Sequence, residues 1–157
     1  MWHVAAFWRP EELAPEPDAA MQVPELARYI AEWGRPADVA LVASVDGEPV
    51  GAAWYRLFAA AEPGYGFVAA DVPEVAVGVE PAARGRGVAT ALLEALLEHA
   101  RRDGFRAVSL SVNEDNPSRR IYLRRGFTDV AHEDGSYVMV RTLRDGRSPS
   151  DEERRTP

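Results

Sequence analysis

A chain of 157 residues with 46% hydrophobic and 27% charged side chains has the length and composition of one ordinary globular domain. Its net charge of -7 argues against nucleic-acid binding, because phosphate backbones are bound through clustered Lys and Arg side chains. The absence of Cys excludes disulfide scaffolds, thiolate zinc sites and cysteine nucleophiles.

The N-terminal part of the chain predicts one clear helix. Residues 1–13, MWHVAAFWRPEEL, lack the basic segment and the apolar run of a signal peptide, and no stretch approaches the ~18 apolar residues of a membrane span. We therefore expect a cytoplasmic protein without a membrane partner. Residues 24–34, PELARYIAEWG, place Leu26, Ile30 and Trp33 on one helical face. This spacing predicts an amphipathic helix of about three turns.

From residue 38 the pattern changes to that of strands. DVALVASV and VGAAWYRLF flank the turn sequence DGEP, which predicts a β-hairpin over residues 38–58. A connection rich in Gly, Ala and Pro follows over residues 59–73, and loops of this length in a domain are often functional. PEVAVGVEP, residues 73–81, predicts the next strand.

The C-terminal half predicts two helices and three strands. The first helix follows Gly87, is ended by Asp103 and Gly104, and carries an apolar stripe of Leu92, Leu93, Leu96, Leu97 and Ala100. FRAVSLSV predicts a strand, and NPSRRIYLRR predicts a short helix with Asn116 as its cap and Pro117 at its first position. FTDVA and SYVMVRTL flank the turn EDG as a second hairpin. We therefore expect a mixed α/β sheet with flanking helices over residues 1–143, and a disordered tail over residues 144–157, which contain no hydrophobic side chain.

The stretch RGRGVAT, residues 84–90, precedes the long helix and is the main functional signal. A helix N-terminus leaves backbone N–H groups unpaired, and Gly85 and Gly87 can adopt positive φ so that these groups turn toward one phosphate. Arg84 and Arg86 add positive charge. The alternative is a glycine-rich turn that only begins the helix. The chain lacks the Gly-Lys-Ser/Thr of a P-loop and the third glycine of a dinucleotide fingerprint.

Two segments resemble motifs of the GCN5-related N-acetyltransferase (GNAT) family. VGVEPAARGRGVATALL is similar to the family's coenzyme A motif, with Arg84, Gly87 and Ala89 at the signature positions. NEDNPSRRIYLRRGF resembles the next motif, in which an Asn opens a helix and a Tyr precedes Gly-Phe, here Asn116 and Tyr122. The order of strands and helices agrees with the family over residues 38–143.

The resemblance implies a bound acetyl-CoA in a mostly antiparallel sheet with splayed strands. The pyrophosphate would lie on residues 84–90, and the pantetheine arm would pair like a strand beside residues 77–79. Gly78 is a candidate for a bulge that parts the strands, with close packing as the alternative. The residues implied to bind the cofactor are Val77, Gly78, Val79, Arg84, Gly85, Arg86, Gly87, Val88, Ala89, Thr90, Asn116, Ser118 and Tyr122.

Acyl transfer to an amine needs a base for the ammonium and an acid for the thiolate. The resemblance implies Tyr122 as the acid, and a phenol is suited because its usual pKa, ~10, is close to that of an alkyl thiol. Packing of this ring against the sheet is the alternative. Glu74 is the candidate base. Its spacing from Val79 is one residue shorter than expected, and such an offset turns a strand side chain to the opposite face. The alternative is a solvated carboxylate at a strand edge. Water relays could serve instead, and backbone N–H groups near Val77 to Val79 could polarise the thioester carbonyl.

An acceptor pocket is predicted from aromatic and basic side chains on the second hairpin strand and in the GYGF loop. They could supply apolar walls and cation-binding faces, with core packing as the alternative for several of them. These residues are Trp54, Tyr55, Arg56, Tyr65 and Phe67. His3, His99 and His132 show no ligand spacing, so we expect no metal. The acceptor would be a small-molecule or peptide amine.

Two departures from the family pattern concern the chain's beginning and its second motif. The family usually opens with a strand, whereas residues 1–8 have a helix-like pattern, which leaves the sheet edge and homodimer formation open. Asn116 and Tyr122 are also one residue closer than is usual. We expect one acyl-CoA N-acyltransferase domain that transfers acetyl directly to a primary amine. The alternatives are a non-catalytic acyl-CoA sensor and a generic nucleotide-binding module.

Overall fold

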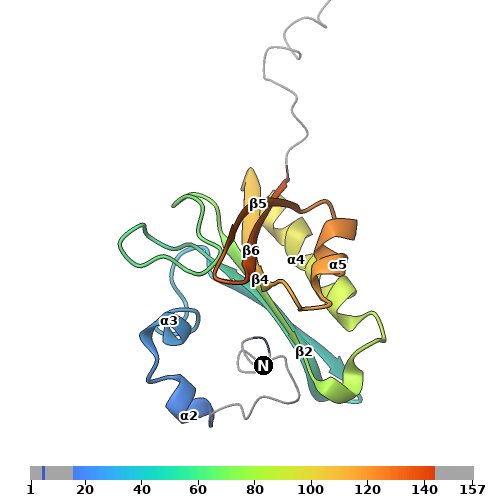
Figure 1. Ribbon diagram of the computed structural model, residues 1–157. Helices are drawn as coiled ribbons and strands as arrows, with labels where there is room; N and C mark the ends of the chain where they lie inside the picture. The colour runs from blue at the N-terminus through green and yellow to red at the C-terminus, as the bar shows by residue number, and fades with distance from the viewer. Residues whose placement is uncertain (1–4, 6–15, 144–157) are drawn as a thin grey trace, which may run out of the picture.

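Six β-strands form one mixed sheet in the computed structural model, which describes Ala5 and residues 16–143 (Figure 1). The strand order is β1-β2-β3-β4-β6-β5, and all neighbours are antiparallel except β3 and β4. This confirms the predicted mixed, mostly antiparallel sheet. The strands are β1 (Val39–Val45), β2 (Glu48–Arg56), β3 (Glu74–Val79), β4 (Ala107–Asn113), β5 (Thr128–Glu133) and β6 (Ser136–Thr142).

The helices flank this sheet. They are α2 (Pro17–Ala20), α3 (Pro24–Ala27), the 3₁₀ helix η1 (Pro81–Ala83), α4 (Val88–Arg102) and α5 (Arg119–Arg124). In Figure 1, α4 and α5 lie together on one side, away from α2 and α3. The apolar stripe predicted for α4 is fully buried and forms the core with the inner faces of β2, β3 and β4. Gly104 and Gly126, both with positive φ, follow the ends of α4 and α5.

Both predicted hairpins turn on an Asp-Gly pair. Asp46 and Gly47 have φ of 51° and 86°, and Asp134 and Gly135 have φ of 49° and 71°. Positive φ at two successive residues is the geometry that matches the twist of antiparallel strands, and Asp-Gly adopts it at low cost. These turns confirm the hairpin predictions for β1–β2 and β5–β6.

The helix predicted over residues 24–34 is wrong in length, because α3 contains only Pro24–Ala27. Single turns continue from α3 as far as the Ala31 N–H, which donates to the Ala27 carbonyl. The carbonyls of Arg28 and Ala31 then accept hydrogen bonds from the Arg56 guanidinium at 2.7 and 2.8 Å instead of from the next helical turn. The predictions for residues 1–8 and 144–157 lie outside the described residues, apart from helical Ala5.

The two central strands separate almost as soon as they meet. β3 and β4 pair only at Glu74 and Ser109, where the Ser109 N–H also donates to the Pro73 carbonyl at 3.0 Å. Beyond this point β3 remains paired with β2 as far as Val79, and β4 remains paired with β6. The expected splay is therefore present. It opens the backbone edge of β3 toward β4.

The splay arises without the bulge predicted at Gly78. Pairing of β3 with β2 is regular through Gly78 and its partner Ala52, so that prediction is wrong. The loop before β3 instead lies directly against β4 just beyond the last β3–β4 pair. A Cβ on Gly66 would come within 2.4 Å of the Leu110 carbonyl carbon and 2.6 Å of the Ser111 nitrogen. The loop therefore packs closely against the β4 backbone at the point where β3 and β4 separate.

Candidate functional site

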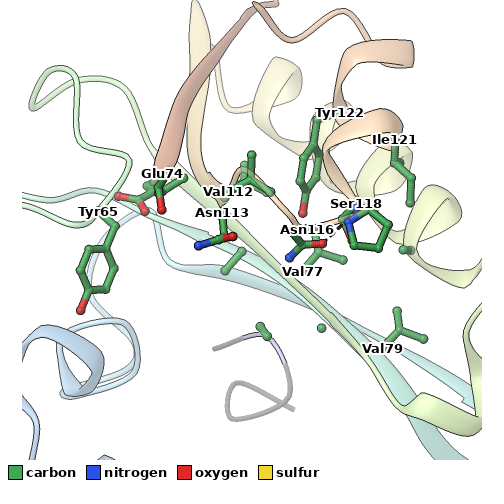
Figure 2. A pocket seen from close by; sticks show the side chains of 18 of the residues that line it. Tyr65, Glu74, Val77, Val79, Val112, Asn113, Asn116, Ser118, Ile121 and Tyr122 are labelled. Atoms are coloured by element: carbon green, nitrogen blue, oxygen red, sulfur yellow. Dashed lines mark hydrogen bonds between the residues drawn. The ribbon is translucent and has the colours of Figure 1, made fainter. Parts of the chain in front are cut away.

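A cavity of about 950 Å³ occupies the splay between β3 and β4 and extends to the start of α4. Figure 2 shows Glu74 and Tyr65 at one end, Val79 and Ile121 toward the other, and Tyr122 between them. Of the residues predicted to bind a cofactor, only Arg86 does not line this cavity. Those that do are Val77, Gly78, Val79, Arg84, Gly85, Gly87, Val88, Ala89, Thr90, Asn116, Ser118 and Tyr122.

The turn before α4 has the conformation of a backbone anion site. Gly85 and Gly87 have φ of 72° and 82°, and Gly87 occupies the N-cap position without a side-chain cap. A Cβ on either glycine would meet nothing within 4 Å, so glycine is needed here for its backbone conformation and not for space. Among the residues that the structure describes, none of the N–H groups from Gly85 to Thr90 donates to a protein acceptor. These donors remain available to a ligand in the cavity.

The two arginines of this turn have different positions. The Arg84 side chain folds back along the turn, and its Nε donates to the Val79 carbonyl at 3.1 Å. This bond ties the turn to the end of β3. Arg86 is exposed and lies outside the cavity lining. Arg84 therefore fixes the turn relative to β3, while Arg86 can act only from the surface.

Asn116 shapes the segment between β4 and α5. Its Oδ1 accepts from the Ser118 N–H at 2.9 Å, and its own N–H donates to the Asn113 carbonyl at 3.0 Å. The prediction that Asn116 caps α5 directly is wrong, because α5 begins at Arg119. Asn116 instead caps the turn that precedes the helix, through the bond from the Ser118 N–H. Pro117, the next residue, has the fixed φ that suits such a turn.

Tyr122 extends from α5 into the middle of the cavity. Its ring packs edge-on against Phe127, with 5.8 Å between the ring centroids. Figure 2 shows its hydroxyl directed toward the side of the cavity where Asn116 and Ser118 lie. Burial raises the pKa of Tyr122 to about 12. The phenol is therefore protonated at neutral pH and can donate a proton or a hydrogen bond.

Glu74 is buried, and it is the residue through which β3 pairs with β4. Only 4% of its surface is exposed, so the alternative of a solvated carboxylate is wrong. The Tyr29 hydroxyl donates to its Oε1 at 2.5 Å, and Oε2 is buried without a hydrogen-bond partner in the described part of the chain. Burial raises the pKa of Glu74 to about 7, an effect that hydrogen bonds from Tyr29 and the Gly66 N–H partly offset. This carboxyl can exchange a proton near neutral pH.

Two of the five residues predicted for an acceptor pocket line the cavity. Trp54 and Tyr65 do so beside Glu74, and the indole N–H of Trp54 is buried without a partner among the described residues. Leu26 and Tyr29, from α3 and the turn after it, complete this end. Sequence reasoning missed Tyr29, and nothing local in the sequence connects it with Glu74, 45 residues away.

Tyr55, Arg56 and Phe67 do not line the cavity, which corrects the prediction of one pocket for all five. Tyr55 points to the opposite face of β2 from Trp54, because strand side chains alternate, and its hydroxyl donates to Asp103 beside α4. Arg56 is 1% exposed and pairs with Asp38 at 2.6 Å beneath α3. Its guanidinium is used to hold the chain after α3 and is not open to a ligand.

Neither a cluster of metal-binding side chains nor a membrane-spanning helix is found in the part of the chain that the structure describes. Within residues 16–143 and Ala5, no group of three or more His, Asp or Glu side chains could hold a metal ion. His132 stacks on Tyr137 and lies 3.0 Å from the Glu114 carboxylate. In the same part of the chain, no helix is both long and apolar enough to cross a membrane.

Comparison with known proteins gives consistent matches. The family model described as "Acetyltransferase (GNAT) family" matches residues 2–127. A mycothiol acetyltransferase from Cellulomonas flavigena is 35% identical over 107 residues, which are 67% of this chain and 30% of that protein. The chain spans about a third of the length of the curated relatives that it matches.

Several solved structures are similar to this chain in fold. The GNAT domain of S. lividans PAT has 31% identity and a TM-score of 0.59, over 68% of this chain and 61% of that chain. A putative acetyltransferase from Salmonella typhimurium, solved with its cofactor acetyl-CoA, has 27% identity and a TM-score of 0.60. That match covers 79% of this chain and 75% of the other.

Proposed function

The chain belongs to the GNAT family of acetyltransferases, and from this premise we propose that it transfers the acetyl group of acetyl-CoA directly to a primary amine. One observation carries the proposal. The turn with unpaired N–H groups, the phenol of Tyr122 and the carboxyl of Glu74 all line the same cavity. An anion site, a proton donor and a proton acceptor are the groups that this reaction requires.

The residues present fit coenzyme A. The N–H groups of Gly85 to Thr90, at the positive end of the α4 dipole, would hold the diphosphate through charge-assisted hydrogen bonds. The edge of β3 from Val75 to Val79 is not paired with β4, so it can bind the amide groups of the pantetheine arm as a neighbouring strand would. When bound, acetyl-CoA supplies an activated acetyl group as a thioester. Bound in this way, the thioester end of the molecule would lie toward Tyr122 and Glu74.

Glu74 would take the proton that the acceptor ammonium must lose. Its pKa of about 7 leaves a substantial carboxylate fraction at neutral pH, and its unpartnered Oε2 is the atom that can receive the proton. The neutral amine then forms a bond to the acetyl carbon as the bond from that carbon to sulfur breaks. The lack of Cys agrees with direct transfer, since no thiol is present to carry the acetyl group.

Tyr122 would return a proton to the departing sulfur. A phenol with a pKa of about 12 is a weak acid in water, but the same dry surroundings raise the basicity of a thiolate. Burial therefore raises the pKa of both the Tyr122 phenol and the coenzyme A thiol, the two groups between which the proton moves. The products are an amide and coenzyme A with its free thiol.

The acceptor end of the cavity suits an organic ammonium ion. Glu74 supplies one buried carboxyl, and Tyr29, Trp54 and Tyr65 supply aromatic faces. The unpartnered Trp54 N–H can donate to an oxygen of the acceptor. The matched relatives named mycothiol acetyltransferase are consistent with a small amine, although this chain spans only about a third of their length.

The test is an amine screen that measures free thiol release from acetyl-CoA by the purified chain. We expect thiol release that depends on a primary amine and stops when that amine is blocked. Calorimetry with acetyl-CoA and ATP is the matched control. Tight acetyl-CoA binding without thiol release from any amine would favour a sensor, and tighter binding of ATP would indicate a nucleotide-binding module.

A further inference from the structure

We propose that Tyr29 is a positioning residue for acetyl transfer: its hydroxyl binds one oxygen of Glu74 and so leaves only the other to accept the proton of the amine. The inference rests on the proposed function, because it takes Glu74 as the proton acceptor. It assigns a role to a segment after α3 that carries no motif.

The direction of the hydrogen bonds at Tyr29 is fixed by their partners. The Tyr29 hydroxyl lies 2.5 Å from Glu74 Oε1 and 2.7 Å from the Tyr65 backbone nitrogen. A backbone N–H can only donate, so the phenol oxygen accepts from Tyr65 and its single proton goes to Glu74. Oε1 is therefore an acceptor in this network. A proton that arrives at Glu74 must bind Oε2 if the hydrogen bond from Tyr29 is to remain.

The ring of Tyr29 is held on two sides. It packs edge-on against Phe58 with 5.1 Å between centroids, and it stacks on Tyr65 with 6.1 Å between centroids and 15° between planes. These contacts involve only the ring, and they fix the position of the hydroxyl group. Loss of the hydroxyl alone would leave the ring packed, so its effect on Glu74 can be measured separately from the packing of the ring.

The position of the Glu74 carboxyl depends on glycine at residue 64. A Cβ at this position would come within 2.1 Å of Glu74 Oε2 and 2.9 Å of the Tyr29 hydroxyl. The carboxyl oxygen Oε2 therefore lies directly against the Gly64 backbone, a position that any side chain at residue 64 would deny it. Oε2 is buried and unpartnered in the described part of the chain, so of the two oxygens it is the one without a hydrogen bond from the protein. Glu74 lines the cavity, and a proton from a bound amine would go to this oxygen.

No cation competes with Tyr29 for Glu74 among the described residues. Arg56 is the cross-strand partner of Glu74 on β2, but its guanidinium pairs with Asp38. Ser109, the partner on β4, carries no charge. In the loop, Tyr65 is a neutral phenol near neutral pH, and the charges that affect it are Glu25 and Arg28. Tyr29 is thus the side chain that orients this carboxyl.

The test is a pH titration of the Glu74 carboxyl carbon by NMR in the full chain, with ¹³C-labelled glutamate assigned through Glu74→Gln. The Tyr29→Phe variant removes a hydrogen bond that favours the charged form, so we expect the titration midpoint to rise by about one pH unit. Replacement of Tyr29 by 3-fluorotyrosine keeps the ring and strengthens the donor, so the midpoint should fall. Tyr65→Phe keeps the backbone N–H and the stacked ring, and it should leave the midpoint in place.

An unchanged or lower midpoint in Tyr29→Phe would overturn the inference, as would an equal shift in Tyr65→Phe. In the acetylation assay, the acidic limb of kcat/KM in Tyr29→Phe should move by the same amount as the midpoint, while the rate at high pH is largely retained. A merely structural role would lower thermal stability without this displacement. Absence of amine-dependent thiol release in the wild type would reject the proposed function, whereas the titration needs no acceptor and still decides what Tyr29 does to Glu74.

Discussion

Replacing Tyr122 with phenylalanine is expected to lower the rate of amine acetylation by about 10²- to 10⁴-fold, the usual contribution of a general acid. The ring contact with Phe127 does not involve the hydroxyl, so the fold of α5 should be kept. Binding of acetyl-CoA should also be nearly unchanged, because the proposed anchors are backbone N–H groups at the start of α4. The measurements are kcat from thiol release and the dissociation constant from calorimetry.

Tyr137→Phe is the matched control for loss of a tyrosine hydroxyl. Tyr137 does not line the cavity, and its ring is held by stacking on His132 and by the Arg119 guanidinium above its face. This variant should retain the wild-type rate. An unchanged kcat in Tyr122→Phe would remove the general-acid role, and equal losses in both variants would point to a general effect on folding.

Glu74→Gln is expected to lower kcat/KM at pH 8 by about 10²-fold or more, since the amide cannot accept the ammonium proton. In the wild type, kcat/KM should rise with pH and level off above about 7, as the buried carboxyl loses its proton. The variant should lose this rise. A wild-type profile that is flat between pH 5 and 8 would contradict the assignment of Glu74 as the base.

The same substitution should stabilise the fold at neutral pH. The pKa of Glu74 is raised from an ordinary value of 4.5 to about 7 by burial, so folding favours the protonated form. Its contribution to stability is complete below about 4.5 and is lost as pH rises through about 7. Relative to the wild type, Glu74→Gln should gain about 3 kcal/mol in free energy of unfolding between pH 4 and pH 8. Urea unfolding at several pH values would measure this, and a difference that does not depend on pH would contradict it.

Local patterns predicted most of the secondary structure because the forces involved are local. The two Asp-Gly turns require positive φ that these residues adopt readily, and the leucine stripe of α4 has one apolar face to bury. The helix over residues 24–34 was predicted on the same grounds and is too long. Its carbonyls bind Arg56, which is distant in sequence and gives no local signal.

The site was predictable where the backbone forms it and less so where side chains meet across the fold. Gly85 and Gly87 adopt the positive φ that the motif implied. Trp54, Tyr55 and Arg56 could not all face one cavity, because consecutive strand residues alternate between faces, and this error was avoidable from the sequence. Tyr29 was not predictable, since its contact with Glu74 depends on how α3 folds against the start of β3.

The central claim is that backbone amides before α4 bind the diphosphate of coenzyme A and so direct the thioester toward Tyr122. It is tested most directly by following the amide signals of Gly85 to Thr90 in ¹H–¹⁵N NMR spectra during titration with coenzyme A. We predict that several of these protons move strongly downfield at saturation, as expected for charge-assisted hydrogen bonds to phosphate. Acetyl-pantetheine, which lacks the diphosphate, should leave them in place. Unchanged amide signals from Gly85 to Thr90 at saturating coenzyme A would contradict the account.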